Sequence, residues 1–129
     1  MNRPIPPKPT DAELAILRVL WQRGHATVRE VADEFNRHQP TGYTTILKLL
    51  QIMTEKGLVR RTAAGRAHIY EPARSAEQTQ QQLVRHLLDR AFDGSASQLV
   101  LRALSAAPAD ASELAQIRAL IRDMERKAK

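Results

Sequence analysis

Two clusters of side chains combine residue types that recognise polyanions. Thr44, Lys48, Gln51 and the acidic Glu55 recur about three to four residues apart, which places them on one face of a helix. From residue 56 to residue 70 the chain has no acidic residue, and its basic residues there are Lys56, Arg60, Arg61 and Arg66. Hydroxyl, amide and ammonium groups can hydrogen-bond to base edges, and arginines pair with phosphates. The clusters therefore favour a surface that fits a nucleic-acid groove.

No constellation in the sequence supports catalysis or metal binding. The chain has no cysteine, which excludes disulfides, thiolate metal sites and cysteine nucleophiles. A metal site would need distant histidines to converge, because they are scattered as His25, His38, His68 and His86. The acidic residues of the first helices have no partner nucleophile and no Gly-rich phosphate loop nearby. We therefore expect no enzyme activity, no metal and no cofactor.

The charge balance supports a polyanionic partner without identifying it. Lys and Arg total 20 against 14 Asp and Glu, which gives a formal net charge of +6. Residues 1–72 hold eleven basic and seven acidic residues, whereas residues 73–129 hold nine and seven. No apolar run approaches membrane-spanning length, and the first ten residues contain no apolar signal segment. We therefore expect a cytoplasmic protein that does not insert into membranes.

Capping patterns predict the first two helices. Thr10 and Glu13 have the spacing of a capping box, and so do Thr27 and Glu30. We expect a first helix that ends at Gly24 and a second, over residues 28–38, that is stopped by Pro40. Residues 1–9 are rich in proline and are predicted to form a flexible arm.

A third helix and a hairpin complete the predicted domain. The third helix should run from residue 43 to residue 56, with Ile46, Leu49, Leu50 and Met53 on its buried face. Strands over residues 58–62 and 67–70 would flank a turn at residues 63–66. A basic hairpin directly after a third helix is a wing. Residues 10–72 are thus predicted to form a winged helix-turn-helix domain, mainly α with a small β-hairpin, with Trp21 and Tyr70 in its core.

The remainder, residues 73–129, which we call the tail, is predicted to form three amphipathic helices, the first over residues 74–91, with breaks at Gly94 and Pro108. Three short helices make a poor independent core, so we expect them to form a dimerisation domain. The alternative is that their apolar stripes pack back on the first domain of the same chain. The residues expected at the dimer interface are Leu83, Leu87, Leu88, Leu99, Val100, Leu104, Leu114, Ile117, Leu120, Ile121 and Met124.

Several segments resemble the penicillinase-repressor family, also called BlaI/MecI/CopY. The similarity is collinear over residues 10–72, through DAELAILRVLW, TVREVADEF, YTTILKLLQIMTEKGLVRR and GRAHIYEP, and continues more weakly through LDRAFDGSASQLVLRAL. The resemblance implies a homodimeric repressor that binds a palindromic promoter operator, like regulators of beta-lactamase or cell-wall-stress genes. It also implies that the third helix enters the major groove and that the wing touches the backbone. The DNA contacts carried over are Tyr43, Thr44, Thr45, Lys48, Arg60, Arg61, Arg66 and His68.

Three features depart from the family pattern. Ile52 stands where many members have a basic residue, so one phosphate contact is expected to be missing. In antibiotic-responsive members a membrane sensor metallopeptidase cuts the second tail helix at an Asn-Phe pair. The corresponding stretch here is Leu101, Arg102 and Ala103. The C-terminal cysteine pairs of the copper-responsive branch are absent.

Each functional interpretation has a plainer alternative. The outer face of the third helix could be an ordinary solvated surface. The wing arginines could serve only to keep an edge hairpin soluble. A different class of function is a protein-interaction adaptor that uses a winged helix without sequence-specific DNA binding.

Overall fold

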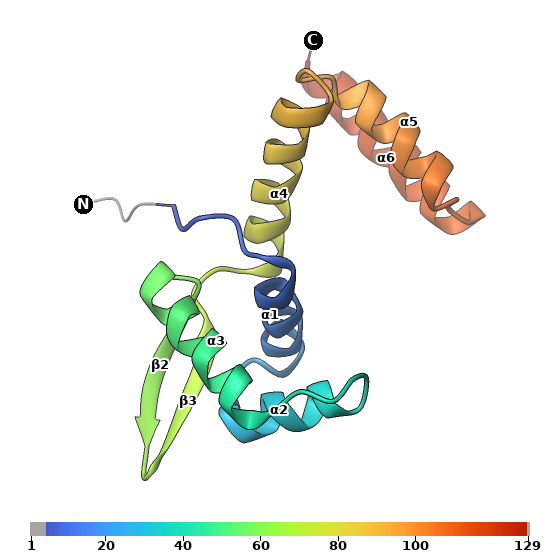
Figure 1. The fold of residues 1–129 in the computed structure, drawn as a ribbon. Helices are drawn as coiled ribbons and strands as arrows, with labels where there is room; N and C mark the ends of the chain where they lie inside the picture. The colour runs from blue at the N-terminus through green and yellow to red at the C-terminus, as the bar shows by residue number, and fades with distance from the viewer. Residues whose placement is uncertain (1–4, 129) are drawn as a thin grey trace. The chain divides into compact units, whose positions relative to one another are not determined.

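The computed structural model describes residues 5–128, and Figure 1 shows the order of their elements. The chain divides into two compact units, Met1–Val84 and Arg85–Lys129. Of the described residues, the first unit contains three helices, a small sheet and the start of a fourth helix, which continues into the second unit. No helix in this part of the chain is both long and apolar enough to cross a membrane.

The first two helices begin at the predicted caps. α1 (Asp11–Arg23) and α2 (Val28–Asn36) both have complete capping boxes. At α1 the Glu13 N–H donates to the Thr10 hydroxyl at 3.2 Å, and the Thr10 N–H donates to the Glu13 carboxylate at 2.9 Å. Two otherwise unpaired backbone donors are satisfied in this way, which confirms the predicted start of α1.

The ends of the helices follow local backbone chemistry. α3 (Tyr43–Lys56) ends as predicted at Gly57, whose φ of +83° is readily reached only by glycine. α2 ends two residues earlier than the expected helix over residues 28–38. Beyond it the Thr41 N–H donates to the Asn36 side-chain oxygen at 2.8 Å, which closes the turn towards α3.

The sheet has three antiparallel strands in the order β1-β3-β2. β1 (Ala26–Thr27) was not predicted, because two residues are too short to show an alternating pattern. β2 (Val59–Ala64) begins one residue later than predicted and ends two residues later, and β3 (Ala67–Pro72) also ends two residues later, so the turn narrows to Gly65 and Arg66. The wing is therefore a longer and tighter hairpin than its sequence suggested.

The core of the first unit collects apolar side chains from α1, α2, α3 and the sheet. Tyr70 is buried, as predicted, whereas Trp21 lies half-buried at the edge of the core. The Trp21 ring nitrogen donates to the carbonyl oxygen of Arg74 at 3.0 Å, which explains why the ring remains at the edge. The buried residues are Ile16, Leu17, Leu20, Ala26, Val28, Val31, Ala32, Ile46, Leu50, Met53, Leu58, Val59 and Tyr70.

Three further helices follow: α4 (Ala76–Ala91), α5 (Ala96–Ala106) and α6 (Ala111–Lys127). α4 begins two residues later than expected, because Ser75 and Gln78 hydrogen-bond to each other's backbone N–H and cap it. The side chains of Ser95 and Asp110 cap α5 and α6 by accepting a hydrogen bond from the backbone N–H of Gln98 and of Glu113, respectively. The three predicted tail helices are therefore present.

The first unit extends past the expected domain boundary after residue 72. In the first turns of α4, Thr79 is buried, and Gln82 donates to the carbonyl oxygen of Pro6 at 2.8 Å. Pro9 is buried as well. The described part of the expected arm, residues 5–9, thus contacts the first unit, and so does the start of α4.

Candidate nucleic-acid interface

Helix α3 presents one face to the core and the other to solvent. Ile46, Leu50 and Met53 are fully buried and hold the helix against α2 and β2. The side chains expected to contact DNA from this helix are all exposed: Tyr43, Thr44, Thr45 and Lys48. This arrangement confirms the two-faced helix that the sequence predicted, and it leaves a polar surface that a DNA groove could accept.

The N-terminus of α3 is open, and an aromatic ring lies beside it. Its N-cap residue is Gly42, which has no side chain to cap the helix, so the first N–H groups are left to solvent or to a partner. The guanidinium carbon of Arg29, on α2, lies 5.1 Å from the centroid of the Tyr43 ring. Sequence reasoning missed Arg29, because no pattern in one sequence pairs it with Tyr43 on the next helix.

The register of the hairpin assigns its polar side chains to two faces. Arg60 lies opposite Glu71, and Arg61 lies opposite Tyr70. Successive side chains of a strand alternate in direction, so Arg60 and Arg61 lie on opposite faces. Arg61 shares the face of buried Tyr70, and His68, two residues before Tyr70, lies on that face too. The predicted wing contacts therefore lie on two faces of the hairpin, with Arg61 and His68 on one face and Arg60 on the other.

Ion pairing also distinguishes the arginines of the wing. The Nε of Arg60 lies 3.4 Å from an oxygen of Glu71, across the two strands. Within residues 5–128 neither Arg61 nor Arg66 has a carboxylate partner. The guanidinium groups of Arg61 and Arg66 are therefore available to pair with a partner, whereas that of Arg60 is paired with Glu71.

A buried acid joins the end of α3 to the start of α1. The Glu13 side chain is almost fully buried, and its Oε2 lies 2.8 Å from the Nζ of Lys56, the last residue of α3. Lys56 remains 33% exposed. Sequence reasoning assigned Glu13 only to the capping box and Lys56 only to the basic cluster, because nothing in the sequence links positions 43 residues apart. The ion pair helps to fix α3 in the first unit.

The surroundings of two capping acids shift their pKa values. Burial alone would raise the pKa of Glu13, but the hydrogen bonds from Lys56 and from the helix cap, with the Lys56 charge, hold it below its ordinary value. The backbone hydrogen bond from Thr27 lowers the pKa of Glu30, and Arg23 beside it lowers it further. Both carboxylates are thus stabilised in their ionised form.

The helices of the tail leave most of their apolar side chains accessible. No residue of α5 or α6 is buried. Five residues of the predicted interface are exposed: Leu87, Val100, Leu120, Ile121 and Met124. The other six are partly buried: Leu83, Leu88, Leu99, Leu104, Leu114 and Ile117. Val84 and Leu101 are also exposed, although neither was in the predicted set. Concentrated apolar exposure of this kind marks interaction surfaces.

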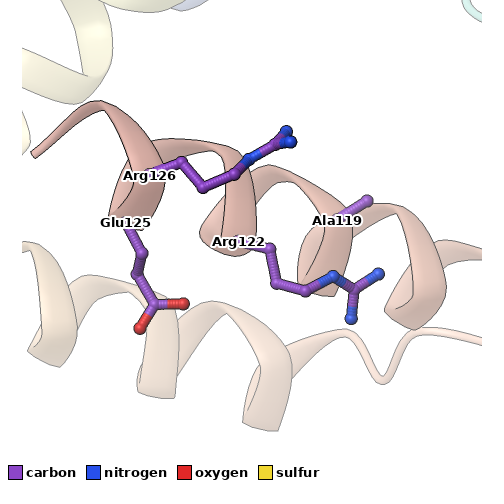
Figure 2. A pocket seen from close by; sticks show the side chains of 4 residues that line it. All are labelled: Ala119, Arg122, Glu125 and Arg126. Carbon is purple, nitrogen blue, oxygen red and sulfur yellow. The ribbon is translucent and has the colours of Figure 1, made fainter. Parts of the chain in front are cut away.

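Among the residues described, one surface of α6 is slightly hollowed. A shallow depression is lined by Ala119, Arg122, Glu125 and Arg126. Figure 2 shows these four side chains, all of which belong to α6. In the same described part of the chain, no three histidines or acids are grouped closely enough to hold a metal ion.

A three-helix unit with a wing and an exposed polar face on its third helix defines a winged-helix DNA-binding protein. The penicillinase repressor family matches residues 9–123, which is most of the chain. The chain therefore belongs to the penicillinase repressor family.

Individual relatives show how far the similarity extends. The chain is 32% identical over 92 residues to the transcriptional regulator BlaI of Mycobacterium tuberculosis, which covers 70% of this chain and 67% of that protein. It is 26% identical over 98 residues to the penicillinase repressor of Bacillus licheniformis, which covers 76% of this chain and 77% of that protein. It is also similar to a solution structure of monomeric Bacillus licheniformis BlaI in complex with the blaP half-operator. The TM-score is 0.50 at 26% identity, covering 57% of this chain and 89% of that one.

These similarities confirm the predicted family and the predicted winged-helix fold. They also agree with the expectation that the chain is not an enzyme, because the family and its matched members are transcriptional regulators.

Proposed function

We propose that the chain represses transcription by binding operator DNA through α3 and the wing. The observation that carries this proposal is the exposed polar face of α3, which lies beside a hairpin whose Arg61 and Arg66 have no described acidic partner. The half-operator complex of the related BlaI supports it, because that protein has a similar fold and is in complex with operator DNA.

Within α3 we assign base reading to Thr44 and Lys48. They lie one helical turn apart on the exposed face, and their hydroxyl and ammonium groups can reach base edges in a major groove. Tyr43 and Thr45 are assigned to the sugar–phosphate backbone near the open N-terminus of the helix. Arg29, stacked on Tyr43, adds a positive charge at the same end.

The wing is assigned to phosphates. Arg61 and His68 share one face of the hairpin, and Arg66 lies at its tip, so these three side chains form the main wing contact. Arg60 can join them only by giving up part of its pairing with Glu71 on the opposite face. Ile52 is half-buried and supplies no charge where many relatives have a basic residue.

We further propose that two copies bind a palindromic operator as a homodimer. Support comes from the exposed apolar side chains of α4, α5 and α6, which a second copy could cover in a symmetric interface. The alternative, packing of these stripes on the first domain of the same chain, would leave a monomer. Sedimentation of the pure chain separates the two outcomes.

Release of the operator by proteolysis is the finer part of the proposal. Leu101, Arg102 and Ala103 lie in α5 with exposed side chains, and a cut there would separate α6 from the rest of the chain. The proposed partner is a membrane sensor metallopeptidase, and the proposed targets are beta-lactamase or cell-wall-stress genes. Co-expression with such a peptidase and mass analysis of the chain would test this. An intact chain after induction would contradict the proteolytic route.

DNA binding itself is tested by a gel shift. The full chain is titrated onto its own upstream DNA in rising salt, against random competitor. A specific band that weakens with salt is expected, because phosphate contacts release counterions. If no fragment is preferred and Lys48→Ala leaves the chain's biological effect intact, the protein-interaction adaptor replaces the repressor.

A further inference from the structure

A series of hydrogen bonds joins the start of α4 to three other parts of the first unit. The Trp21 ring nitrogen donates to the Arg74 carbonyl oxygen at 3.0 Å. The Arg74 guanidinium donates to Oε1 of Gln82 at 3.2 Å, and Nε2 of Gln82 donates to the Pro6 carbonyl oxygen at 2.8 Å. The series therefore connects α1, the segment after β3, α4 and the N-terminal segment, and each of its bonds is partly shielded from solvent.

Gln82 is the centre of this series, because both ends of its amide are engaged. An amide held at both ends keeps one orientation, which ties its helix to both partners. Thr79, one turn earlier on the same side of α4, is buried. Gln81, the residue directly before Gln82, is exposed and makes no side-chain hydrogen bond within residues 5–128. The packed side of α4 is therefore the side that carries Thr79 and Gln82.

This anchoring acts on the helix that leads out of the DNA-binding unit. α4 is continuous from Ala76 to Ala91 and passes the end of the first unit at Val84. In a dimer joined through the second unit, the direction in which α4 leaves each first unit limits the separations that two copies of α3 can adopt. The two half-sites of a palindrome, in turn, lie at a fixed separation along the DNA.

We infer that Gln82, with Arg74 and the Pro6 carbonyl, is a positioning element that sets the half-site separation the dimer accepts. The inference rests on the proposed function, operator binding by a homodimer. Arg74, Gln82 and Pro6 lie outside α3 and the wing, so the element acts on spacing and not on the reading of bases.

The test compares Gln82→Ala with Gln81→Ala, a neighbouring glutamine without these bonds. The probes are duplexes with two inverted copies of the half-site that the wild-type chain selects from a random-sequence library. Their separations are the selected one and those one or two base pairs shorter or longer. We expect wild type and Gln81→Ala to lose affinity steeply away from the selected separation. Gln82→Ala should bind the selected duplex about three- to tenfold more weakly, and its affinity should change less with half-site separation than that of wild type.

A second pair of variants removes the acceptor instead of the donor. Deletion of residues 2–7 eliminates the Pro6 carbonyl, whereas deletion of residues 2–4 spares it. Only the longer deletion should reduce the dependence of DNA affinity on half-site separation. Binding to a duplex with one half-site should be equal in all variants, which distinguishes positioning from a general loss of folded protein.

Two results would overturn the inference. One is an unchanged dependence on separation in Gln82→Ala and in the longer deletion. The other is an equal loss of affinity at every separation and on the single half-site, which would indicate a role in stability alone. A wild-type chain that binds paired and single half-sites equally well would instead contradict the dimeric repressor, and the inference would fall with it.

Discussion

The two compact units use amphipathic helices in opposite ways. In the first unit the apolar faces of α1, α2 and α3 meet over a shared core, and Leu50 at its centre is 0% exposed. In the second unit α5 and α6 bury no residue, and Leu120 is 57% exposed. Helices with the same periodicity of apolar residues thus bury those residues in a core in the first unit and leave them exposed to solvent in the second. The difference supports the proposal that a second copy of the chain covers the exposed apolar side chains of the second unit, whereas the core of the first unit is closed within one chain.

The largest expected effect contrasts one leucine from each region. Leu50→Ala should destabilise the first unit by about 2–5 kcal/mol, because it leaves a cavity in a closed core. Leu120→Ala should change the unfolding of that unit by less than about 0.5 kcal/mol. Denaturation followed by the fluorescence of Trp21, the single tryptophan, reports on the first unit directly. Equal destabilisation by both variants would refute the division between the regions.

A second contrast concerns assembly. Leu120→Glu combined with Met124→Glu should weaken the dimer at least about tenfold, because charge is placed on a surface that a second copy would cover. Glu125→Ala, next to this surface, serves as a control in the same helix. Analytical ultracentrifugation measures the dissociation constants. A double variant that associates as tightly as wild type would show that these side chains do not form the interface.

The ion pair between Glu13 and Lys56 should make the stability of the first unit depend on pH. The pKa of Glu13 is lowered in the folded state, so its contribution is complete above the ordinary value of 4.5 and is lost as the pH falls through the lower folded-state value. Glu13→Gln should cost about 1–3 kcal/mol at neutral pH, because Lys56 loses its carboxylate. The stabilities of wild type and variant should converge in acid. A constant difference at all pH values would exclude ionisation of Glu13 as the cause.

On the DNA-binding surface, Lys48 and Arg61 are expected to behave differently. Lys48→Ala should reduce discrimination at one base pair by about 1–3 kcal/mol. Arg61→Ala should weaken selected and random DNA alike. Competition titrations with single-base variants of the selected site measure both effects. If every variant loses affinity equally on all sequences, the assignment of bases to α3 and phosphates to the wing is wrong.

The smallest effect separates two neighbouring arginines. Arg61→Ala should lower the slope of log affinity against log salt by about one unit, as for one lost phosphate contact. Arg60→Ala should lower it less, because Arg60 lies on the opposite face and pairs with Glu71. A larger change for Arg60 would mean that the other face of the hairpin meets the DNA.

Local patterns predicted the helices of both regions well. Thr10 with Glu13, and Gly57, mark helix ends through hydrogen bonds within a few residues, so they are visible in one sequence. The exposed polar face of α3 followed from periodicity in the same way. These features required no knowledge of how distant segments meet.

The features that the sequence did not predict depend on distant contacts. The pairing of Glu13 with Lys56, the stacking of Arg29 on Tyr43 and the short strand β1 join segments whose proximity no local pattern records. The separation of Arg60 from Arg61 could have been anticipated from strand alternation, but only once the register was known. The extent of the first unit likewise depended on contacts of α4 that a change in composition near residue 72 did not reveal.

The most direct test of the account measures DNA binding and stoichiometry together. The full chain is titrated onto fluorescent duplexes with two inverted half-sites, one half-site or random sequence, at several salt concentrations, and the mass of each complex is determined. The account predicts two chains on the paired duplex, tighter binding there than on one half-site, and affinity that falls with salt. Equal binding to the paired and random duplexes, or one chain per paired duplex, would contradict it.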